Sequence, residues 1–389
     1  MKPTHLGFLA CAAIFALATT ATARAEYTFT LIADSTSPTF SAFDLDPSIN
    51  SAGTVAFYAV RDGGGTGIFT GAGGATTPVA LSTGAVGEFY SLAYSPSINA
   101  AGTVAFHGAI RTGTGVELGI FTASGGVALP LALTTGPTFD GFETYPKINA
   151  TGTVAFGAHM DSGDFGVFTV AGGVTTPIAL GGGTSFINIG GPAINAAGMV
   201  AYVVRFFSGD TGIFLWEGGV ATPIALASGP VFSGFSGIAS LNEAGTVAFR
   251  ATLDTGDKGV FTIASGVVTP VALSSGMIFS EFNPSGPIPP AINADGTVAF
   301  SANLTAGGNG IYLANEGAIS RVIGTGDALF GSTVARIPGS PALNDSGQVA
   351  FSYELANGVK GVAVASPVPE PSSALLLAAG GALLIRRRR

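Results

Sequence analysis

A segment of about 50 residues recurs seven times along this chain. One clear copy is SINAAGTVAFHGA at residues 97–109, and PSINSAGTVAFYA precedes it at 47–59. Each copy has an asparagine three residues before a glycine, and successive asparagines are 46 to 51 residues apart. These asparagines are Asn50, Asn99, Asn149, Asn195, Asn242, Asn293 and Asn344. A period of this length is typical of β-propeller blades, each of which buries its apolar faces only against its neighbours.

Every repeat divides into the same four predicted strands. Pro-x-Ile-Asn forms a short first strand, and Thr-Val-Ala-Phe-x-Ala alternates with period two as the second. Gly-Ile-Phe, as at 67–69, marks the third strand, and Thr-Pro-Ile-Ala-Leu or a variant marks the fourth. We expect the asparagine to bond its own backbone in a type I turn and the glycine to adopt a left-handed conformation. The repeated asparagine is therefore predicted to be structural rather than catalytic.

The two ends of the repeat region complement each other. The chain contains seven asparagine hairpins and seven third strands, but only six fourth strands follow a third strand. The predicted strand at 27–33 precedes the first hairpin and has no blade of its own. If it completes the last blade, the ring closes and both exposed sheet edges disappear. We therefore predict an all-β fold, a single seven-bladed β-propeller of four-stranded blades, spanning residues 27–365.

The N-terminus predicts export. Lys2, an apolar run over 6–18 and the sequence Ala23-Arg24-Ala25 together form a secretory signal peptide, residues 1–25, with cleavage after Ala25. Cys11, the only cysteine, lies inside this peptide. The mature chain is therefore expected to have no disulfide, no thiolate metal site and no thiol nucleophile.

The C-terminus, residues 366–389, predicts a transient membrane anchor. A Pro-Glu-Pro motif is followed by an apolar run over 374–385 and four arginines. Twelve helical residues reach only about 18 Å, whereas the hydrocarbon core is about 30 Å thick. The arginines would stay on the cytoplasmic side and stop transfer. The segment would thus hold an exported protein briefly at the inner membrane.

This C-terminal order resembles the PEP-CTERM sorting signal of exopolysaccharide-producing Gram-negative bacteria. The residues that carry the resemblance are Pro369, Glu370, Pro371, Arg386, Arg387, Arg388 and Arg389. The resemblance implies a partner, the membrane protease exosortase, which recognises the tail and releases or transfers the protein to the cell surface or the biofilm matrix. The repeats themselves resemble NxxGxxAF tandem repeats and, more distantly, TolB-type propeller repeats. Neither repeat family implies one activity, because fold does not determine function.

The charge balance excludes one class of partner and leaves one cofactor open. Without the two terminal segments the chain has 9 basic and 22 acidic residues, a net charge of about −13, so nucleic acid is not an expected partner. Two similar loops carry paired aspartates, Asp161 with Asp164 and Asp254 with Asp257. Short oxygen-rich loops can bind calcium. The sequence favours a turn-forming role, because the full calcium-loop spacing is missing, and it predicts no other cofactor.

The chain offers little for catalysis. We expect the first strands to line the central channel, where no carboxylate or histidine stands at the variable positions, so no catalytic residue is predicted. These positions are Ser48, Ser97, Lys147, Ala193, Ser240, Ala291 and Ala342. His107 and His159 occupy non-equivalent repeat positions and are expected to be surface or loop histidines rather than metal ligands.

Aromatic residues recur between the fourth strand of one repeat and the first strand of the next, as at Phe40 and Phe43. We expect them in the core between blades, with stacking on sugars as the alternative. The sequence favours a non-enzymatic exported protein that binds exopolysaccharide or another envelope component, or that is purely structural. The alternative is a propeller glycan hydrolase or lyase that uses loop carboxylates.

Overall fold

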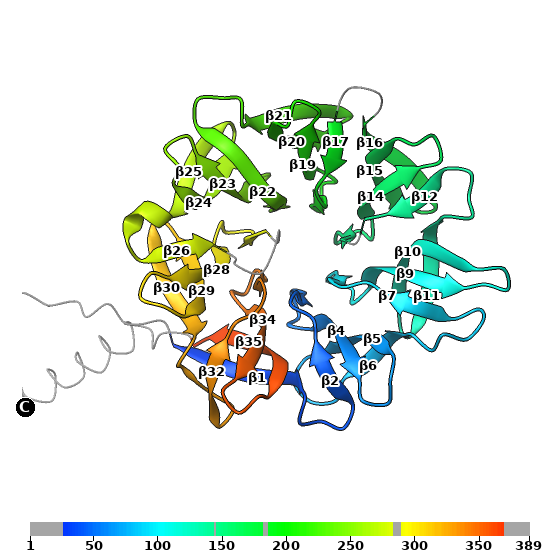
Figure 1. Ribbon diagram of the computed structural model, residues 1–389, viewed down its shortest axis with the longest axis horizontal. Coiled ribbons are helices and arrows are strands. Elements are labelled where there is room, and N and C mark those ends of the chain that lie inside the picture. Colours follow the sequence, from blue (N-terminus) through cyan, green and yellow to red (C-terminus); the bar gives the residue numbers. More distant parts are fainter. Residues whose placement is uncertain (1–25, 144, 182–185, 283–288, 369–389) are drawn as a thin grey trace, which may run out of the picture.

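The computed structural model describes residues 26–143, 145–181, 186–282 and 289–368. The predicted signal peptide, its cleavage site and the C-terminal motif lie outside the described residues. The described residues form seven antiparallel sheets around one central axis, as Figure 1 shows. The predicted seven-bladed propeller is therefore confirmed.

The first six blades share one order of strands from the axis outward. Blade one contains β2 (Phe40–Phe43), β3 (Ser48–Ile49), β4 (Val55–Arg61), β5 (Thr66–Gly71) and β6 (Thr77–Leu81). Blade two contains β7 (Phe89–Leu92), β8 (Ser97–Ile98), β9 (Val104–Arg111), β10 (Val116–Ser124) and β11 (Val127–Leu133). Blade three contains β12 (Phe139–Phe142), β13 (Lys147–Ile148), β14 (Val154–Met160), β15 (Phe165–Ala171) and β16 (Val174–Gly181).

The next three blades continue the pattern. Blade four contains β17 (Phe186–Ile189), β18 (Ala193–Ile194), β19 (Val200–Phe206), β20 (Thr211–Glu217) and β21 (Val220–Leu226). Blade five contains β22 (Phe232–Leu241), β23 (Val247–Leu253), β24 (Lys258–Ala264) and β25 (Val267–Leu273), followed by the short 3₁₀ helix η1 (Ser274–Gly276). Blade six contains β26 (Phe279–Phe282), β27 (Ala291–Ile292), β28 (Val298–Leu304), β29 (Asn309–Asn315) and β30 (Ala318–Gly324).

Blade seven joins the two ends of the chain. It contains β31 (Ala328–Leu329), β32 (Ser332–Arg336), β33 (Ala342–Leu343), β34 (Val349–Leu355), β35 (Lys360–Pro367) and the N-terminal strand β1 (Tyr27–Asp34). Strand β1 pairs antiparallel with β35, and Figure 1 shows it beside the C-terminal blade. The predicted closure by the N-terminal strand is confirmed. Phe29 of β1 also packs edge-on against Phe351, with ring centroids 6.3 Å apart.

The first strand of each blade is longer than predicted. The segments that were expected to connect blades are themselves strands: β2, with Phe40, pairs with the end of β4, and β3 pairs with its beginning. Asp44 to Pro47 separate the two pieces, because proline has no N–H to continue the ladder. In blade five the inner strand β22 is continuous, but its register shifts between Ser236 and Ser240.

The core lies between neighbouring blades. Strand β4 alternates, so that Val55 and Phe57 pack toward blade seven, whereas Ala56 and Tyr58 pack toward blade two. Phe57 stacks on Phe69 of β5 at 5.8 Å. The recurring aromatics approach such stacks edge-on and are buried, which confirms their predicted core role at Phe40, Phe139, Phe232 and Phe279.

The repeated asparagine forms the predicted turn and also joins the blades. The Asn50 side-chain oxygen accepts the N–H groups of Ala52 and Thr54 at 3.1 and 2.9 Å. Gly53 has a φ of +80°, which is the left-handed conformation expected of it. The Asn50 amide then donates to the backbone oxygen of Asn99 in the next blade at 3.1 Å. All seven asparagines repeat this contact, which forms a closed belt of hydrogen bonds.

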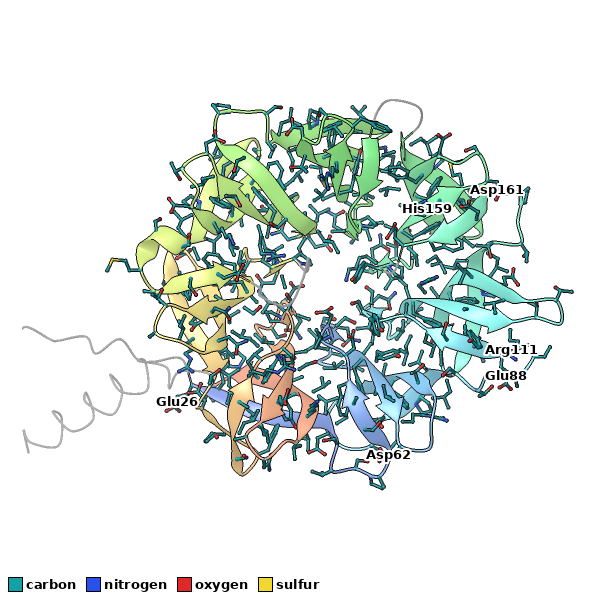
Figure 2. All side chains as sticks on the ribbon, viewed as in Figure 1. Glu26, Asp62, Glu88, Arg111, His159 and Asp161 are labelled. Atoms are coloured by element: carbon teal, nitrogen blue, oxygen red, sulfur yellow. The ribbon has the colours of Figure 1, made fainter. Side chains whose placement is uncertain are left out.

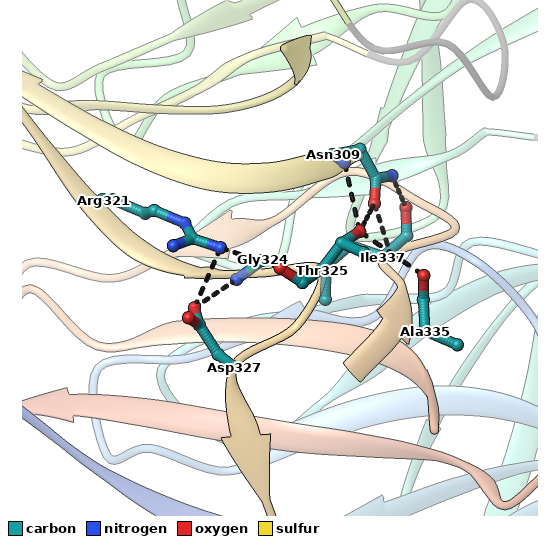
Figure 3. Close-up of polar contacts among 7 residues, drawn as sticks. All are labelled: Asn309, Arg321, Gly324, Thr325, Asp327, Ala335 and Ile337. Carbon is teal, nitrogen blue, oxygen red and sulfur yellow. Dashed lines mark hydrogen bonds and ion pairs between the residues drawn. The ribbon is translucent and has the colours of Figure 1, made fainter. Parts of the chain in front are cut away.

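A polar network joins blades six and seven (Figure 3). The Asn309 side chain donates to the Ile337 carbonyl at 2.5 Å and accepts its N–H at 3.0 Å. Asp327 forms an ion pair with Arg321 at 3.2 Å and accepts the Gly324 N–H at 2.8 Å. The Asp327 carboxylate therefore stabilises the connection between these two blades.

Candidate functional site

The central channel is lined by two rings of side chains. One ring lies two residues before each repeat asparagine and contains the predicted positions, from Ser48 to Ala342, all of which line the channel. The second ring lies four residues before each asparagine and consists of Asp46, Ser95, Tyr145, Gly191, Ile238, Pro289 and Ser340. Except for Gly191, this second ring also lines the channel cavity, whose volume is about 300 Å³.

The two charged side chains of the channel wall, among the described residues, lie in its first three blades. Asp46, Ser95 and Lys147 belong to blades one to three, whereas Ile238 and Ala291 belong to blades five and six. No histidine and one carboxylate, Asp46, are found among the described residues that line the channel. The seven positions predicted to line the channel do line it, but the sequence analysis missed Asp46.

Asp46 has two protein partners inside the channel. Its carboxylate accepts the Ser95 hydroxyl at 3.2 Å and the Ser340 N–H at 3.4 Å. Burial raises the pKa of Asp46 to about 6, and the negative charge of Asp44 contributes in the same direction. Burial lowers the pKa of the Lys147 amine, while Asp46 opposes that shift through space. These two groups place one acidic and one basic side chain in the wall of the channel.

A second cavity, here called the side pocket, lies between blades three, four and five. Its volume is about 480 Å³, and it shares Tyr145 and Ile238 with the channel. Arg205 enters from the end of β19, and Asp210 from the turn between β19 and β20. Phe235 of β22 belongs to its wall. The pocket lies on the face with the turns between second and third strands, here called the loop face.

The side pocket combines aromatic and polar groups. Glu143 lines it and also contacts His159, with 3.3 Å between Glu143 Oε1 and His159 Nε2. The Phe235 N–H donates to the Thr211 hydroxyl at 3.2 Å, which joins blades four and five at the pocket floor. Backbone groups approach closely there, since several lining residues are glycines. The pocket therefore offers hydrogen-bonding groups and apolar surface side by side.

The candidate calcium residues form turns. Asp161 and Asp164 belong to the turn between β14 and β15, where the Ser162 hydroxyl donates to Asp164 at 3.1 Å. Asp257, in the turn of blade five that also contains Asp254, likewise accepts the Thr255 hydroxyl at 3.1 Å. Blade four separates the two turns, and Figure 2 shows Asp161 at the outer part of the ring.

Within the part of the chain that the structure describes, no group of three or more histidine, cysteine, aspartate or glutamate side chains could hold a metal ion. Each pair of turn aspartates therefore lacks a third acidic or histidine ligand nearby among these residues. Calcium binding at Asp161 with Asp164, or at Asp254 with Asp257, stays a prediction.

The two histidines differ from each other. His159 is exposed at the end of β14 and contacts Glu143, as expected of a surface histidine. The same expectation is wrong for His107, which lies in β9 with both ring nitrogens buried and its ring near Phe142. Neither nitrogen has a hydrogen-bond partner among the described residues. Burial lowers the pKa of His107 to about 4, so the ring is neutral at physiological pH.

Sequence reasoning missed the second channel ring and the side pocket. The ring position could have been found by extending the repeat alignment two residues toward the N-terminus, where Asp46, Ser95 and Tyr145 align. The side pocket had no such signal, because Arg205 and Phe235 belong to different repeats and non-equivalent positions. Only the packing of blade four on blade five brings them together.

These features define the class: a closed seven-bladed β-propeller with a polar channel and an adjoining pocket on its loop face. The chain belongs to a family of unknown function (DUF7453), whose model matches residues 32–375. Residues 367–389 match the PEP-CTERM protein-sorting motif, which confirms the resemblance seen in the sequence. This motif is recognised by exosortase, so the protein is directed to export and the cell surface.

A search of curated protein sequences finds no significant match. Among the residues that the structure describes, no helix is long and apolar enough to cross a membrane.

Solved structures with a similar fold are propeller proteins. An acylaminoacyl peptidase from Pyrococcus horikoshii is 12% identical, with a TM-score of 0.52 over 86% of this chain. This chain spans only 54% of that peptidase. YCF48 bound to D1 peptide is 14% identical, with a TM-score of 0.46 over 88% of this chain and 95% of that one. A fucose-specific lectin from Aleuria aurantia is 10% identical, with a TM-score of 0.40 over 73% and 97%. At these identities the peptidase shows the fold alone.

Proposed function

We propose that this protein is a non-enzymatic binding module of the cell surface or biofilm matrix, and that its side pocket binds a segment of exopolysaccharide. The composition of the side pocket carries this proposal. Tyr145 and Phe235 supply aromatic surface for the apolar faces of sugar rings. Arg205, Glu143 and Asp210 supply donors and acceptors for sugar hydroxyls. The volume of about 480 Å³ lies within the usual range of ligand pockets.

The point where the chain leaves the propeller supports this role. Strand β35 runs from the loop face, where Lys360 pairs with Glu354, toward the asparagine turns. At its far end the Ser366 hydroxyl accepts the Gln348 amide at 3.0 Å, next to the turn of Asn344. The described part of the chain therefore ends, at Val368, on the face opposite the side pocket. While the tail is held in the membrane, the pocket would be turned outward, toward extracellular polymer.

Export would begin with the signal peptide, residues 1–25, and end with exosortase acting on the tail after a transient stay at the inner membrane. The mature body carries a net charge of about −13. Such a charge favours solubility and disfavours nucleic acid as a partner.

The alternative is a glycan hydrolase that uses the two carboxylates of the side pocket, Glu143 and Asp210. Glycoside hydrolysis needs one general acid and a second carboxylate on opposite sides of the scissile bond. Both groups line one cavity, which is the observation that favours this alternative. Incubation with the host polysaccharide, followed by a reducing-end assay, separates the two functions. Binding without release of new ends supports the module, whereas steady release supports the enzyme.

The binding experiment compares two arginine variants of the purified exported protein. Arg205→Ala removes a charged side chain of the pocket, and Arg61→Ala removes an arginine from blade one, outside the pocket. Host exopolysaccharide should raise the thermal midpoint of the wild type and of Arg61→Ala, because a ligand that binds only the folded state stabilises it. The shift should be reduced in Arg205→Ala. Equal shifts in all three proteins would place the polymer elsewhere, and no shift in any of them would remove the binding function.

A further inference from the structure

Lys147 stands apart from its equivalents in the channel. The other six positions of its ring are serine or alanine, so Lys147 contributes the one long side chain there. It belongs to the short strand β13, whose pairing with β14 fixes it in the wall. A lysine directed to bulk solvent would need no explanation, but this one lines a cavity at the propeller axis.

The Lys147 amine has no direct partner within the part of the chain that the structure describes. None of the hydrogen bonds or ion pairs there includes it. Asp46 acts on it only through space, and the Asp46 oxygens already accept from Ser95 and Ser340. An ammonium group has three N–H donors. Because the Lys147 amine lies at the wall of the cavity with its N–H donors uncommitted, an anion in the cavity would accept hydrogen bonds from it.

Two serines of the same ring have donors to spare, Ser97 in the adjacent blade and Ser48 one blade further round. The Ser48 hydroxyl oxygen accepts the Ile98 N–H, and the Ser97 hydroxyl oxygen accepts the Ile148 N–H, each at 3.2 Å. A hydroxyl that accepts one hydrogen bond still has its own proton to donate. Both serines line the same cavity as Lys147. This wall therefore offers an amine and two hydroxyl donors, the complement of a carboxylate.

The size and charge of the channel narrow the ligand further. A cavity of about 300 Å³ lies at the lower end of ligand pockets, which suits a group about as large as one sugar unit. Lys147 and Asp46 are the two charged residues among the described residues that line it. Asp46 would repel a doubly charged phosphate more strongly than a singly charged carboxylate. Ile238, Ala291 and Ala342, from blades five, six and seven, provide an apolar surface for a sugar ring.

We propose that the channel is a carboxylate site, in which Lys147, Ser48 and Ser97 bind the carboxylate of a sugar acid. The proposal rests on the proposed function for the source of that sugar, a uronate unit of the exopolysaccharide. It adds a substrate class, since the side pocket alone does not distinguish acidic from neutral sugars.

The test measures binding of glucuronate, glucose and acetate to the exported protein by calorimetry. Glucuronate should bind, and glucose should bind at least about tenfold more weakly, because hydrogen bonds to charged groups are the stronger ones. Acetate distinguishes a small-carboxylate site from a sugar-acid site. Equal or tighter binding of acetate would overturn the sugar-acid assignment, and equal binding of glucose would overturn the carboxylate site.

Two lysine variants complete the test. Lys147→Met should lose at least about tenfold in glucuronate affinity. Its thermal midpoint without ligand should stay the same or rise, because the amine that is removed makes no hydrogen bond within the described chain and methionine keeps the apolar stem. Lys258→Met, which alters an exposed lysine paired with Glu281, is the control and should bind as the wild type does. Unchanged glucuronate affinity in Lys147→Met would overturn the proposal. A lower midpoint without any glucuronate binding in the wild type would assign Lys147 a structural role and also overturn it.

The outcomes separate this proposal from the proposed function. Polysaccharide binding that depends on Arg205, without glucuronate binding, would remove the channel site and keep the binding module. Glucuronate binding that depends on Lys147, without polysaccharide binding, would support the channel site. It would also show that the sugar acid does not come from the exopolysaccharide.

Discussion

The Asn344 side-chain amide donates to the backbone oxygen of Asn50 at 2.9 Å, across 294 residues of chain. This contact joins blade seven to blade one and completes the belt that the other six asparagines form. The same asparagine oxygen holds its own turn, so each side chain serves the hairpin and the neighbouring blade together. The belt lies on the face that carries the asparagine turns, opposite the loop face where the side pocket lies.

The belt predicts that the side-chain amide N–H and the side-chain oxygen of one asparagine contribute separately to stability. Asn149→Asp keeps the oxygen that accepts from Thr151 and Thr153 but loses the amide that donates to Asn195. The variant should lose about 1–3 kcal/mol of unfolding free energy, because a buried carbonyl is left unpaired beside a new charge. Chemical denaturation measures this loss. Asn315→Asp, at an exposed turn of the same face, is the control, and an equal loss there would argue against the belt.

The closing strand predicts a second stability effect. Phe29→Ala removes the ring that packs on Phe351 and should cost about 2 kcal/mol, less than a fully buried phenylalanine. Thr28→Ala, exposed in the same strand, should be nearly neutral. Thermal unfolding of both variants checks the pair. Deletion of 26–34 should in addition expose the edge of β35 and cause association, visible by size-exclusion chromatography.

His107 predicts a loss of stability in mild acid. Its pKa falls from the usual 6.5 to about 4 on folding, because burial disfavours the charged ring. Between these values the unfolded chain binds a proton that the folded protein does not, so stability decreases as pH falls from 6.5 to 4, by up to about 3 kcal/mol. His107→Leu should flatten that slope in unfolding measurements across this range. His159→Gln, at an exposed position, should leave it in place.

Asp46 predicts the opposite dependence of folding stability on pH. Its pKa rises from 3.8 to about 6 on folding, chiefly through burial and also through Asp44. The folded protein therefore retains a proton that the unfolded chain releases, and this stabilising contribution is present below pH 3.8 and lost as pH rises through 6. Asp46→Asn should be more stable than the wild type at pH 7, by up to about 3 kcal/mol, and equal to it near pH 3.5. Asp62→Asn, whose carboxylate is exposed, controls for the change in net charge.

The sorting motif predicts a processed product. The intact mass of the protein recovered from the cell surface should lack Arg386–Arg389, because exosortase acts on the tail. Mass spectrometry of the exported form measures this directly. Recovery of the full tail on the exported protein would contradict processing, and a strain without exosortase should retain the tail.

The repeat predicted the blade number and the order of strands, because hairpin pairing is local and depends on turn residues close in sequence. The closing strand β1 followed instead from the strand count, since only six fourth strands follow a third strand. It did not predict that β2 and its equivalents belong to the blades. The sequence around Phe40 reads as a connection, since Pro47 interrupts it. Pairing of β2 with the end of β4 depends on a bulge that no turn signal announces.

The candidate site was only partly predictable, for a related reason. The first-strand positions, including Lys147, follow directly from the repeat. The charge environment of Lys147 does not, because Asp46 is about a hundred residues away in sequence and acts across the channel. The burial of the His107 ring was likewise unexpected. Phe142, which packs near it, belongs to the next blade, and the sequence around His107 does not indicate that contact.

The sequence by itself determined the seven-fold hairpin repeat, the all-β class and the sorting motif, because each depends on residues within a few positions of one another. The tertiary structure alone decided the asparagine belt, the joining of Asp46 and Lys147 in one channel wall and the side pocket. Each of these joins residues from different blades, and closing the ring is what brings them within hydrogen-bond or packing distance.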